Sequence, residues 1–215
     1  HLFGIRRGEI MRSDGIYGFY PVVPDVEWVD RLLGWGVKTL QLRIKDQPLE
    51  RVEDQVATAI QLAKDHRAQL VINDYWQIAL AHGAEYLHLG QEDLDEADLD
   101  LLVRSRIKLG ISTHSLAELD RALGCHPDHV ALGPVYETTL KQMPWAPQGL
   151  ERVRRWKEMI SCPLVAIGGL TLERAPGVLA AGADSIAMVS DVTLNPDPEG
   201  RAAAWLALFA RRAAA

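Results

Sequence analysis

Residues 69–89 read QLVINDYWQIALAHGAEYLHL, and they contain the repeating unit of this chain. The apolar runs at 69–73 and 86–89 have the length and composition of short buried strands. The segment between them has helical patterning and ends at Gly83-Ala84, where a C-terminal glycine cap would close a helix. A strand, a helix and a second strand in this order predict a parallel β-sheet built from repeated βα units.

The same unit recurs along the whole chain. The predicted strands cover 17–23, 39–44, 69–73, 86–89, 108–112, 129–133, 163–167 and 185–189. Helical patterns fill the gaps, as in 49–64, where Val52, Val56 and Ile60 follow at four-residue steps on one face. Strict alternation over eight strands predicts an α/β fold with a single closed (β/α)8 (TIM) barrel. An open doubly wound sheet usually has only about five or six strands.

Composition limits the classes of function. A charged fraction of 24% and a hydrophobic fraction of 48% are typical of a globular domain. The net charge of −6 and a pI near 5.6 argue against a nucleic-acid partner, which would need a basic face. No apolar run approaches the roughly 20 residues that cross a bilayer, so we expect no membrane partner. Cys125 and Cys162 lack metal-binding spacing, and a reducing, cytoplasmic setting is expected.

The domain organisation is expected to be simple. We assign 15–215 to one catalytic barrel domain. The first residues, 1–14, are interpreted as an N-terminal extension or a tag remnant, with the cut end of a longer fusion protein as the alternative.

In such a barrel the active site lies at the carboxyl ends of the strands. After the second strand, Gln41, Arg43 and Lys45 alternate with Leu42 and Ile44, so the amide and the two cations share one face. This set would suit an anionic substrate, and a solvated strand end is the alternative.

Two carboxylates follow the next strands. Asp74 comes after the third strand and Asp93 after the fourth, and a pair of carboxylates at adjacent strand ends suits Mg²⁺. Each could instead be a helix N-cap. Ser112 ends the fifth strand, where it could donate to a ligand oxygen or cap the helix that starts near Leu116. For His88 we favour a packing or ring-positioning role over a general base.

The remaining candidates follow strands six to eight. A Pro-containing segment, 134–148, is interpreted as a lid that carries Thr138, Thr139 and Lys141. Gly168-Gly169 and Val189-Ser190 end strands seven and eight, where barrels commonly bind a phosphate through backbone N–H groups. Two anion sites in one barrel suggest an enzyme that joins two phosphorylated molecules.

Taken together, the motifs resemble the thiamine-phosphate synthase family, within the superfamily that it shares with thiazole tautomerases. The matching segments are QLRIK, INDYW, HLGQED, GISTH, GPVYETTLKQMPWAPQGL, AIGG and MVS, in order from about residue 17 to 190. The longest segment and INDYW look closest to the enterobacterial type. Each motif alone is weak, but the ordered set is highly specific.

The resemblance implies that the chain condenses hydroxymethylpyrimidine diphosphate with a thiazole phosphate to give thiamine phosphate and pyrophosphate, by a dissociative, Mg²⁺-assisted mechanism. It implies that the pyrimidine diphosphate is held by Gln41, Arg43, Lys45, Asn73, Ser112 and Lys141, of which Arg43, Lys45, Ser112 and Lys141 are catalytic. The thiazole phosphate would be held by Thr138, Thr139, Leu140, Gly169, Val189 and Ser190. Asp74 and Asp93 would bind Mg²⁺.

Two positions depart from the family pattern. Leu140 stands where the family usually has a hydroxyl, and Thr139 could substitute for it. Ile44 replaces a commoner Glu on the face away from the cations. A thiazole tautomerase is the first alternative function, although Pro134 occupies the position of its histidine. A non-catalytic binder of thiamine precursors is the second. Small-molecule substrates are the expected partners, and assembly into a homo-oligomer is left open.

Overall fold

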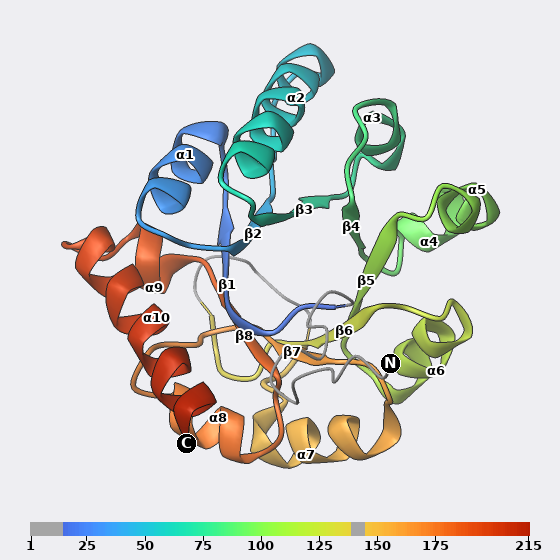
Figure 1. The fold of residues 1–215 in the computed structure, drawn as a ribbon. Helices are drawn as coiled ribbons and strands as arrows, with labels where there is room; N and C mark the ends of the chain where they lie inside the picture. The colour runs from blue at the N-terminus through green and yellow to red at the C-terminus, as the bar shows by residue number, and fades with distance from the viewer. Residues whose placement is uncertain (1–14, 139–144) are drawn as a thin grey trace, which may run out of the picture.

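The computed structural model describes residues 15–138 and 145–215 as a closed barrel of parallel strands (Figure 1). The strands pair in chain order, and β8 pairs with β1 to close the ring. Their bounds are β1 (Gly18–Val23), β2 (Thr39–Leu42), β3 (Gln69–Asn73), β4 (Tyr86–Leu89), β5 (Lys108–Thr113), β6 (His129–Leu132), β7 (Leu164–Ala166) and β8 (Ser185–Met188). The predicted (β/α)8 barrel is therefore confirmed.

Helices form the outer ring in Figure 1. They are α1 (Val26–Gly34), α2 (Leu49–Asp65), α3 (Trp76–Ala81), α4 (Asp93–Glu96), α5 (Leu99–Arg104), α6 (Leu116–Gly124), α7 (Gly149–Met159), α8 (Ala175–Ala180), α9 (Ser190–Thr193) and α10 (Pro198–Ala214). Two short helices, α4 and α5, follow β4, and α9 precedes α10 after β8. The predicted helix at 49–64 is α2, one residue longer.

The core has two layers. Side chains between the sheet and the helices form the outer layer, which includes Val52, Val56 and Trp156. The barrel interior is a separate cluster made of alternate strand residues and of Ile16, which precedes β1; its members are Ile16, Tyr20, Val22, Val71, Tyr86, Ala131, Val165 and Ala187. Filling by side chains from alternate strand positions makes the interior a packed core rather than a pore.

Glycines fix two kinds of local geometry. Gly36, Gly83 and Gly182 each follow a helix with positive φ, as the predicted glycine caps require. Gly110 on β5 has another role, because a Cβ atom there would lie 1.9 Å from Cε1 of His129. Only glycine at this position leaves space for the buried His129 ring inside the barrel.

No helix within the described ranges is long and apolar enough to cross a membrane. Both cysteines are free thiols. The division into 1–14 and a barrel domain at 15–215 stays a prediction, because residues 1–14 lie outside the described part of the chain.

Candidate functional site

At the end of β2, Gln41 and Ile44 lie on opposite faces of the strand, as the alternation predicts. Gln41 is buried and donates through Nε2 to the Tyr20 hydroxyl at 2.8 Å. The strand ends at Leu42, two residues before the predicted end, but the Arg43 N–H still donates to the Val23 carbonyl at 2.9 Å. Ile44 is buried in the outer core, so its side chain points away from the cations as expected.

The two predicted carboxylates lie together. The Lys45 ammonium contacts Asp74 at 2.7 Å, and the side chains of Asp74 and Asp93 share a hydrogen bond. Burial raises the pKa of Asp74, but the hydrogen bonds of Lys45 and Asp93 outweigh it and hold the pKa below its usual value. Burial, followed by the contact with Asp74, raises the pKa of Asp93 to about 6. The two carboxylates therefore interact directly, and each changes the pKa of the other.

Neither carboxylate is a helix N-cap. Tyr75 occupies the cap position of α3 and makes no side-chain cap bond. Asp93 is the first residue of α4, and its carboxylate accepts from the Gly90 N–H at 3.0 Å. Asp74 and Tyr75 both have left-handed backbone conformations, with φ of 59° and 45°. Such backbone is costly for a tyrosine and typically occurs where a side chain must be aimed for function.

Ser112 also lacks the alternative capping role, because Ser115 caps α6 by accepting from the Glu118 N–H. Ser112 Oγ instead lies 2.7 Å from Nε2 of His88. Nδ1 of His88 lies 3.1 Å from Nε2 of His129, and Nδ1 of His129 lies 2.8 Å from the Tyr86 hydroxyl. These four side chains form one hydrogen-bonded chain from the barrel interior to the carboxyl end of β5.

The two histidines of this hydrogen-bonded chain, His88 and His129, are buried and neutral. Burial lowers the pKa of His88 to about 4, and the Arg43 charge adds to this while Asp74 opposes it. Burial, together with the neighbouring His88, also lowers the pKa of His129 well below its usual value. The sequence indicated a positioning role for His88 but missed His129. Alternation along β6 from Ala131 could have identified it as an inward-facing residue.

Gly168 and Gly169 follow β7 with φ of 102° and 63°. A Cβ on Gly168 would lie 2.4 Å from Cα of Pro134, and one on Gly169 would lie 2.4 Å from the Glu137 carbonyl oxygen. The two glycines are therefore needed for close packing against the segment that follows β6.

The segment after β8 turns directly into α9. Val189 is half-buried and Ser190 is exposed at the first position of this short helix. Asp191 anchors the helix, because its carboxylate accepts from Arg201 of α10 at 2.9 Å and from the Trp205 indole N–H at 2.8 Å. Arg201 also binds Glu173 in the segment after β7, at 2.7 and 2.9 Å. Arg201 thus links the segments after β7 and β8, a link that the sequence did not indicate.

The predicted lid is only partly described. Thr138 is half-buried after β6, and the helix that ends the segment, α7, begins at Gly149. Gln148 lies at its start and donates to the His114 carbonyl at 2.8 Å. The predicted site residues Thr139, Leu140 and Lys141 lie outside the described residues.

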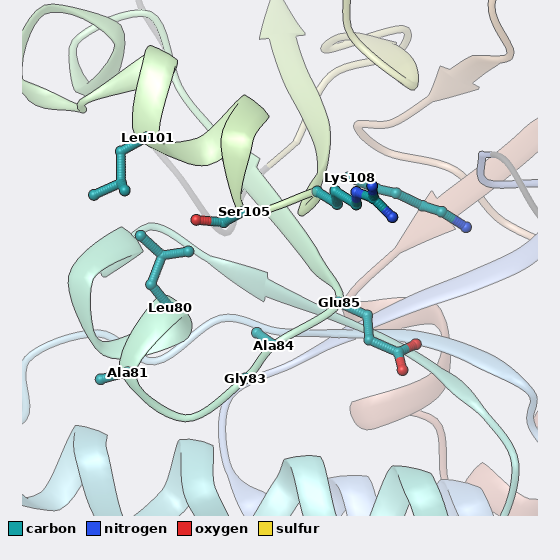
Figure 2. A pocket seen from close by; sticks show the side chains of 9 residues that line it. Leu80, Ala81, Gly83, Ala84, Glu85, Leu101, Ser105 and Lys108 are labelled. Carbon is teal, nitrogen blue, oxygen red and sulfur yellow. The ribbon is translucent and has the colours of Figure 1, made fainter.

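Two hollows lie at opposite ends of the barrel. One, of about 630 Å³, borders the predicted site and is lined by residues that include Pro24, Arg43, Lys45, Gln47 and Arg51. The other, of about 660 Å³, appears in Figure 2 between α3 and α5, where Leu80 and Leu101 face one another. Glu85 and Lys108 on its border lie at the amino ends of β4 and β5, away from the strand ends where barrel enzymes bind substrate.

The fold and these strand ends define a class. The chain is a (β/α)8-barrel protein with cations, a carboxylate pair and a hydroxyl together at the carboxyl ends of β2 to β5, and glycine-rich backbone after β7. This arrangement is typical of barrel enzymes that act on phosphorylated substrates.

Comparison with known proteins gives the family. A family model described as thiamine monophosphate synthase matches residues 19–192. A thiamine-phosphate synthase of Rhizobium etli is 52% identical over 89% of this chain and 95% of its own. One of Klebsiella pneumoniae, an enterobacterial relative, is 52% identical over 84% of this chain and 86% of its own. The solved thiamine phosphate pyrophosphorylase of Pyrococcus furiosus superposes with a TM-score of 0.80 at 28% identity, over 91% of this chain and 96% of its own.

The chain therefore belongs to the thiamine monophosphate synthase family. The resemblance seen in the motifs is confirmed, including its enterobacterial relatives. The expectation of a transferase that forms thiamine phosphate is likewise confirmed at the level of the family.

Proposed function

We propose that this chain joins 4-amino-2-methyl-5-hydroxymethylpyrimidine diphosphate to 4-methyl-5-(2-phosphoethyl)thiazole, giving thiamine phosphate and pyrophosphate. The bond between the pyrimidine methylene carbon and the diphosphate oxygen breaks first, and pyrophosphate leaves with the electron pair. The thiazole nitrogen then donates its lone pair to the methylene cation. The observation that carries the proposal is the carboxylate pair beside Lys45 and Arg43, in a chain of this family.

The cations of this chain act on the leaving group. Arg43 and Lys45 follow β2 beside the same hollow, and Lys141 belongs to the predicted lid. Positive charge held where pyrophosphate forms stabilises the negative charge that grows as the bond breaks. Gln41 and Asn73 are buried at the ends of β2 and β3, where their amides can orient the aminopyrimidine, and Ser112 donates to the diphosphate.

Asp74 and Asp93 are proposed to hold Mg²⁺. The donor set fits, because Mg²⁺ uses one or two carboxylates and completes its coordination with water and substrate phosphate. Burial and the neighbouring Asp74 raise the pKa of Asp93, as expected where two carboxylates face one another, and this supports the assignment. When bound, Mg²⁺ would neutralise charge on the departing pyrophosphate.

The thiazole phosphate is proposed to bind at the other side of the barrel. Thr138, Gly169, Val189 and Ser190 supply hydroxyl and backbone donors at the ends of β6 to β8, with Thr139 and Leu140 from the lid. Positive φ at Gly168 and Gly169 allows this backbone a turn that can direct its N–H groups toward the phosphate. The link from Arg201 to Glu173 and Asp191 supports these segments from outside the site.

The mechanism needs no general base, because neither bond change requires removal of a proton from carbon. The site agrees with this, since His88 and His129 are buried and neutral and both ring nitrogens of each are already hydrogen-bonded. A thiazole tautomerase and a non-catalytic precursor binder remain the alternatives. Pro134 at the tautomerase histidine position disfavours the first, and a binder would have little use for two carboxylates beside the cations.

The proposal is tested by pyrophosphate release from the purified protein. Release at a substantial rate is expected only with Mg²⁺ and both substrates present. The assay runs each substrate alone, both together, and both with excess chelator. Equal turnover in chelator would contradict the metal assignment, and release without the thiazole phosphate would contradict the joining reaction.

The two ends of the site should differ in kinetics. Lys141→Ala is expected to lower chiefly kcat, by about 2–4 kcal/mol of barrier, because its charge counts most when pyrophosphate forms. Ser190→Ala is expected to raise chiefly KM for the thiazole phosphate, by about 1.5–3 kcal/mol of binding, since the charge of that phosphate does not change. Steady-state kinetics with each substrate varied in turn measure both effects. A Ser190→Ala effect confined to the pyrimidine diphosphate would mean that the two substrates are assigned the wrong way round.

The remaining assignments are part of the same proposal. Two small-molecule substrates are the proposed partners, and free thiols at Cys125 and Cys162 support a cytoplasmic setting.

A further inference from the structure

The hydrogen bonds that link Tyr86, His129, His88 and Ser112 must all run in the same donor-to-acceptor direction. We propose that Tyr86 and His129 are positioning residues that act through His88 to keep the hydroxyl proton of Ser112 free for donation to the pyrimidine diphosphate. This proposal rests on the proposed role of Ser112. It adds two residues from the barrel interior that do not touch substrate.

The protons of this hydrogen-bonded chain can be arranged in only two ways. A neutral imidazole has one N–H and one lone pair, and all four ring nitrogens of His88 and His129 are used within the chain. Either both rings carry the proton on Nε2 and every bond is directed toward Ser112, or both carry it on Nδ1 and every bond is directed toward Tyr86. Mixed states would put two protons or two lone pairs face to face between the rings, 3.1 Å apart.

Tyr86 selects the first arrangement. Its hydroxyl is buried, and burial raises the pKa of the phenol, so the proton stays on the oxygen. Among the described residues, the only acceptor within hydrogen-bond distance of this proton is Nδ1 of His129. In the reverse arrangement the phenol would accept from His129, and its own buried proton would be left without a partner among the described residues, which is unfavourable.

The direction decides what Ser112 can bind. When Nε2–H of His88 donates to Ser112 Oγ, the hydroxyl proton of Ser112 remains available for a ligand oxygen. In the reverse arrangement Ser112 would donate its only proton to His88, and its free lone pairs would face the oxygens of an anion. An anionic diphosphate needs donors, so only the first arrangement allows Ser112 to bind it.

Packing inside the barrel holds the side chains of this hydrogen-bonded chain in position. β5 lies between β4 and β6, and the His129 ring crosses it through the space left by Gly110. The rings of His88 and His129 stack with centroids 5.2 Å apart, and the His129 ring also contacts the ring of Tyr20 edge-on. Packing on both sides thus limits rotation of the imidazoles.

The first experiment reads the tautomers without using activity. Nitrogen-15 NMR of the full-length protein labelled on histidine distinguishes protonated from unprotonated ring nitrogens, and His88→Gln and His129→Gln variants assign the signals. We expect both rings to carry the proton on Nε2. Protons on Nδ1 of both rings would overturn the proposal even if the enzyme forms thiamine phosphate.

The second experiment uses Tyr86→Phe, which removes the phenolic oxygen and adds no atom. We expect kcat with saturating substrates to fall about five- to tenfold, the size expected for loss of one ordinary net hydrogen bond. In a Ser112→Ala background the same change should have no further effect, because the hydroxyl through which Tyr86 would act on the substrate is then absent. Equal fold losses in both backgrounds would show a merely structural role and overturn the proposal.

Ser185→Ala is the matched control. The Ser185 hydroxyl is also buried and donates at 2.8 Å to the Gly18 carbonyl, so its loss removes a buried bond away from Ser112. Thermal stability should fall, while kcat should stay unchanged. Wild-type kinetics of Ser112→Ala would overturn the catalytic half of the proposal together with the role of Ser112, whereas absence of pyrophosphate release in the wild type would contradict the proposed function itself.

Discussion

Asp74→Asn is expected to lower kcat by about 10²–10³-fold, since it removes one of two carboxylates proposed to hold the ion that neutralises pyrophosphate. Asn retains the size of the side chain and tolerates the left-handed backbone at this position, where φ is 59°. The barrel should therefore remain folded. Asp93→Asn is expected to act in the same direction, because it removes the second carboxylate proposed to hold the ion.

The measurement is kcat at saturating substrates over a series of Mg²⁺ concentrations, with circular dichroism to verify folding. Asp98→Asn is the matched control, because it makes the same chemical change at the N-cap of α5, where Asn is an equally good cap. Its kcat should match that of the wild type. Near-normal kcat in both Asp74→Asn and Asp93→Asn would show that the ion is held elsewhere.

Gly110→Ala is expected to cause the largest loss of stability. The added Cβ would lie 1.9 Å from Cε1 and 2.2 Å from Nε2 of His129, and neither the ring nor the strand can move far inside a closed barrel. Overpacked cores typically lose up to about 3 kcal/mol or more. For a chain of this length that corresponds to a fall in Tm of about 6–12 °C.

Thermal unfolding of four variants, Gly110→Ala, Gly124→Ala, His129→Ala and the double variant of Gly110 and His129, tests the cause. Gly124→Ala, at the exposed end of α6, adds the same methyl group where no atom lies within 4 Å, so its Tm should stay equal or rise slightly. The double variant Gly110→Ala with His129→Ala should lose less than the sum of the two single losses, because removal of the ring vacates the space that the methyl needs. A strictly additive double variant would mean that the clash is not with His129.

The strands could be predicted because each is a short apolar run between helical patterns. The last residues of β1, β3 and β4 were predicted correctly, whereas those of the other five strands differ by one or two residues. Arg43 and Ile44 continue the alternation of β2 past its end at Leu42, because alternation follows the direction of side chains while a strand ends where its pairing ends. The same distinction explains why β7 is shorter than the apolar run at 163–167.

Part of the candidate site could likewise be predicted from the sequence, and part could not. Asp74 and Asp93 were predicted together because the carboxyl ends of adjacent parallel strands must meet at one end of a barrel. The chain from Tyr86 to Ser112 was not predicted, because His129 reaches across β5 and depends on the side chain missing at Gly110. Arg201 was missed for a related reason: nothing in the local pattern of a C-terminal helix indicates which distant segments its charged side chains contact.

The pairing of β1 with β8 has a consequence for how the protein is made. The Ser185 hydroxyl and the Gly18 carbonyl that it binds are 167 residues apart, so the first strand leaves the ribosome long before its neighbour exists. Until then, β1 and each newly added strand present open edges that can pair with other nascent chains. Synthesis of the last quarter of the chain therefore ends the period in which the protein is exposed to aggregation, and chains that stop before β8 retain two open edges, on β1 and β7.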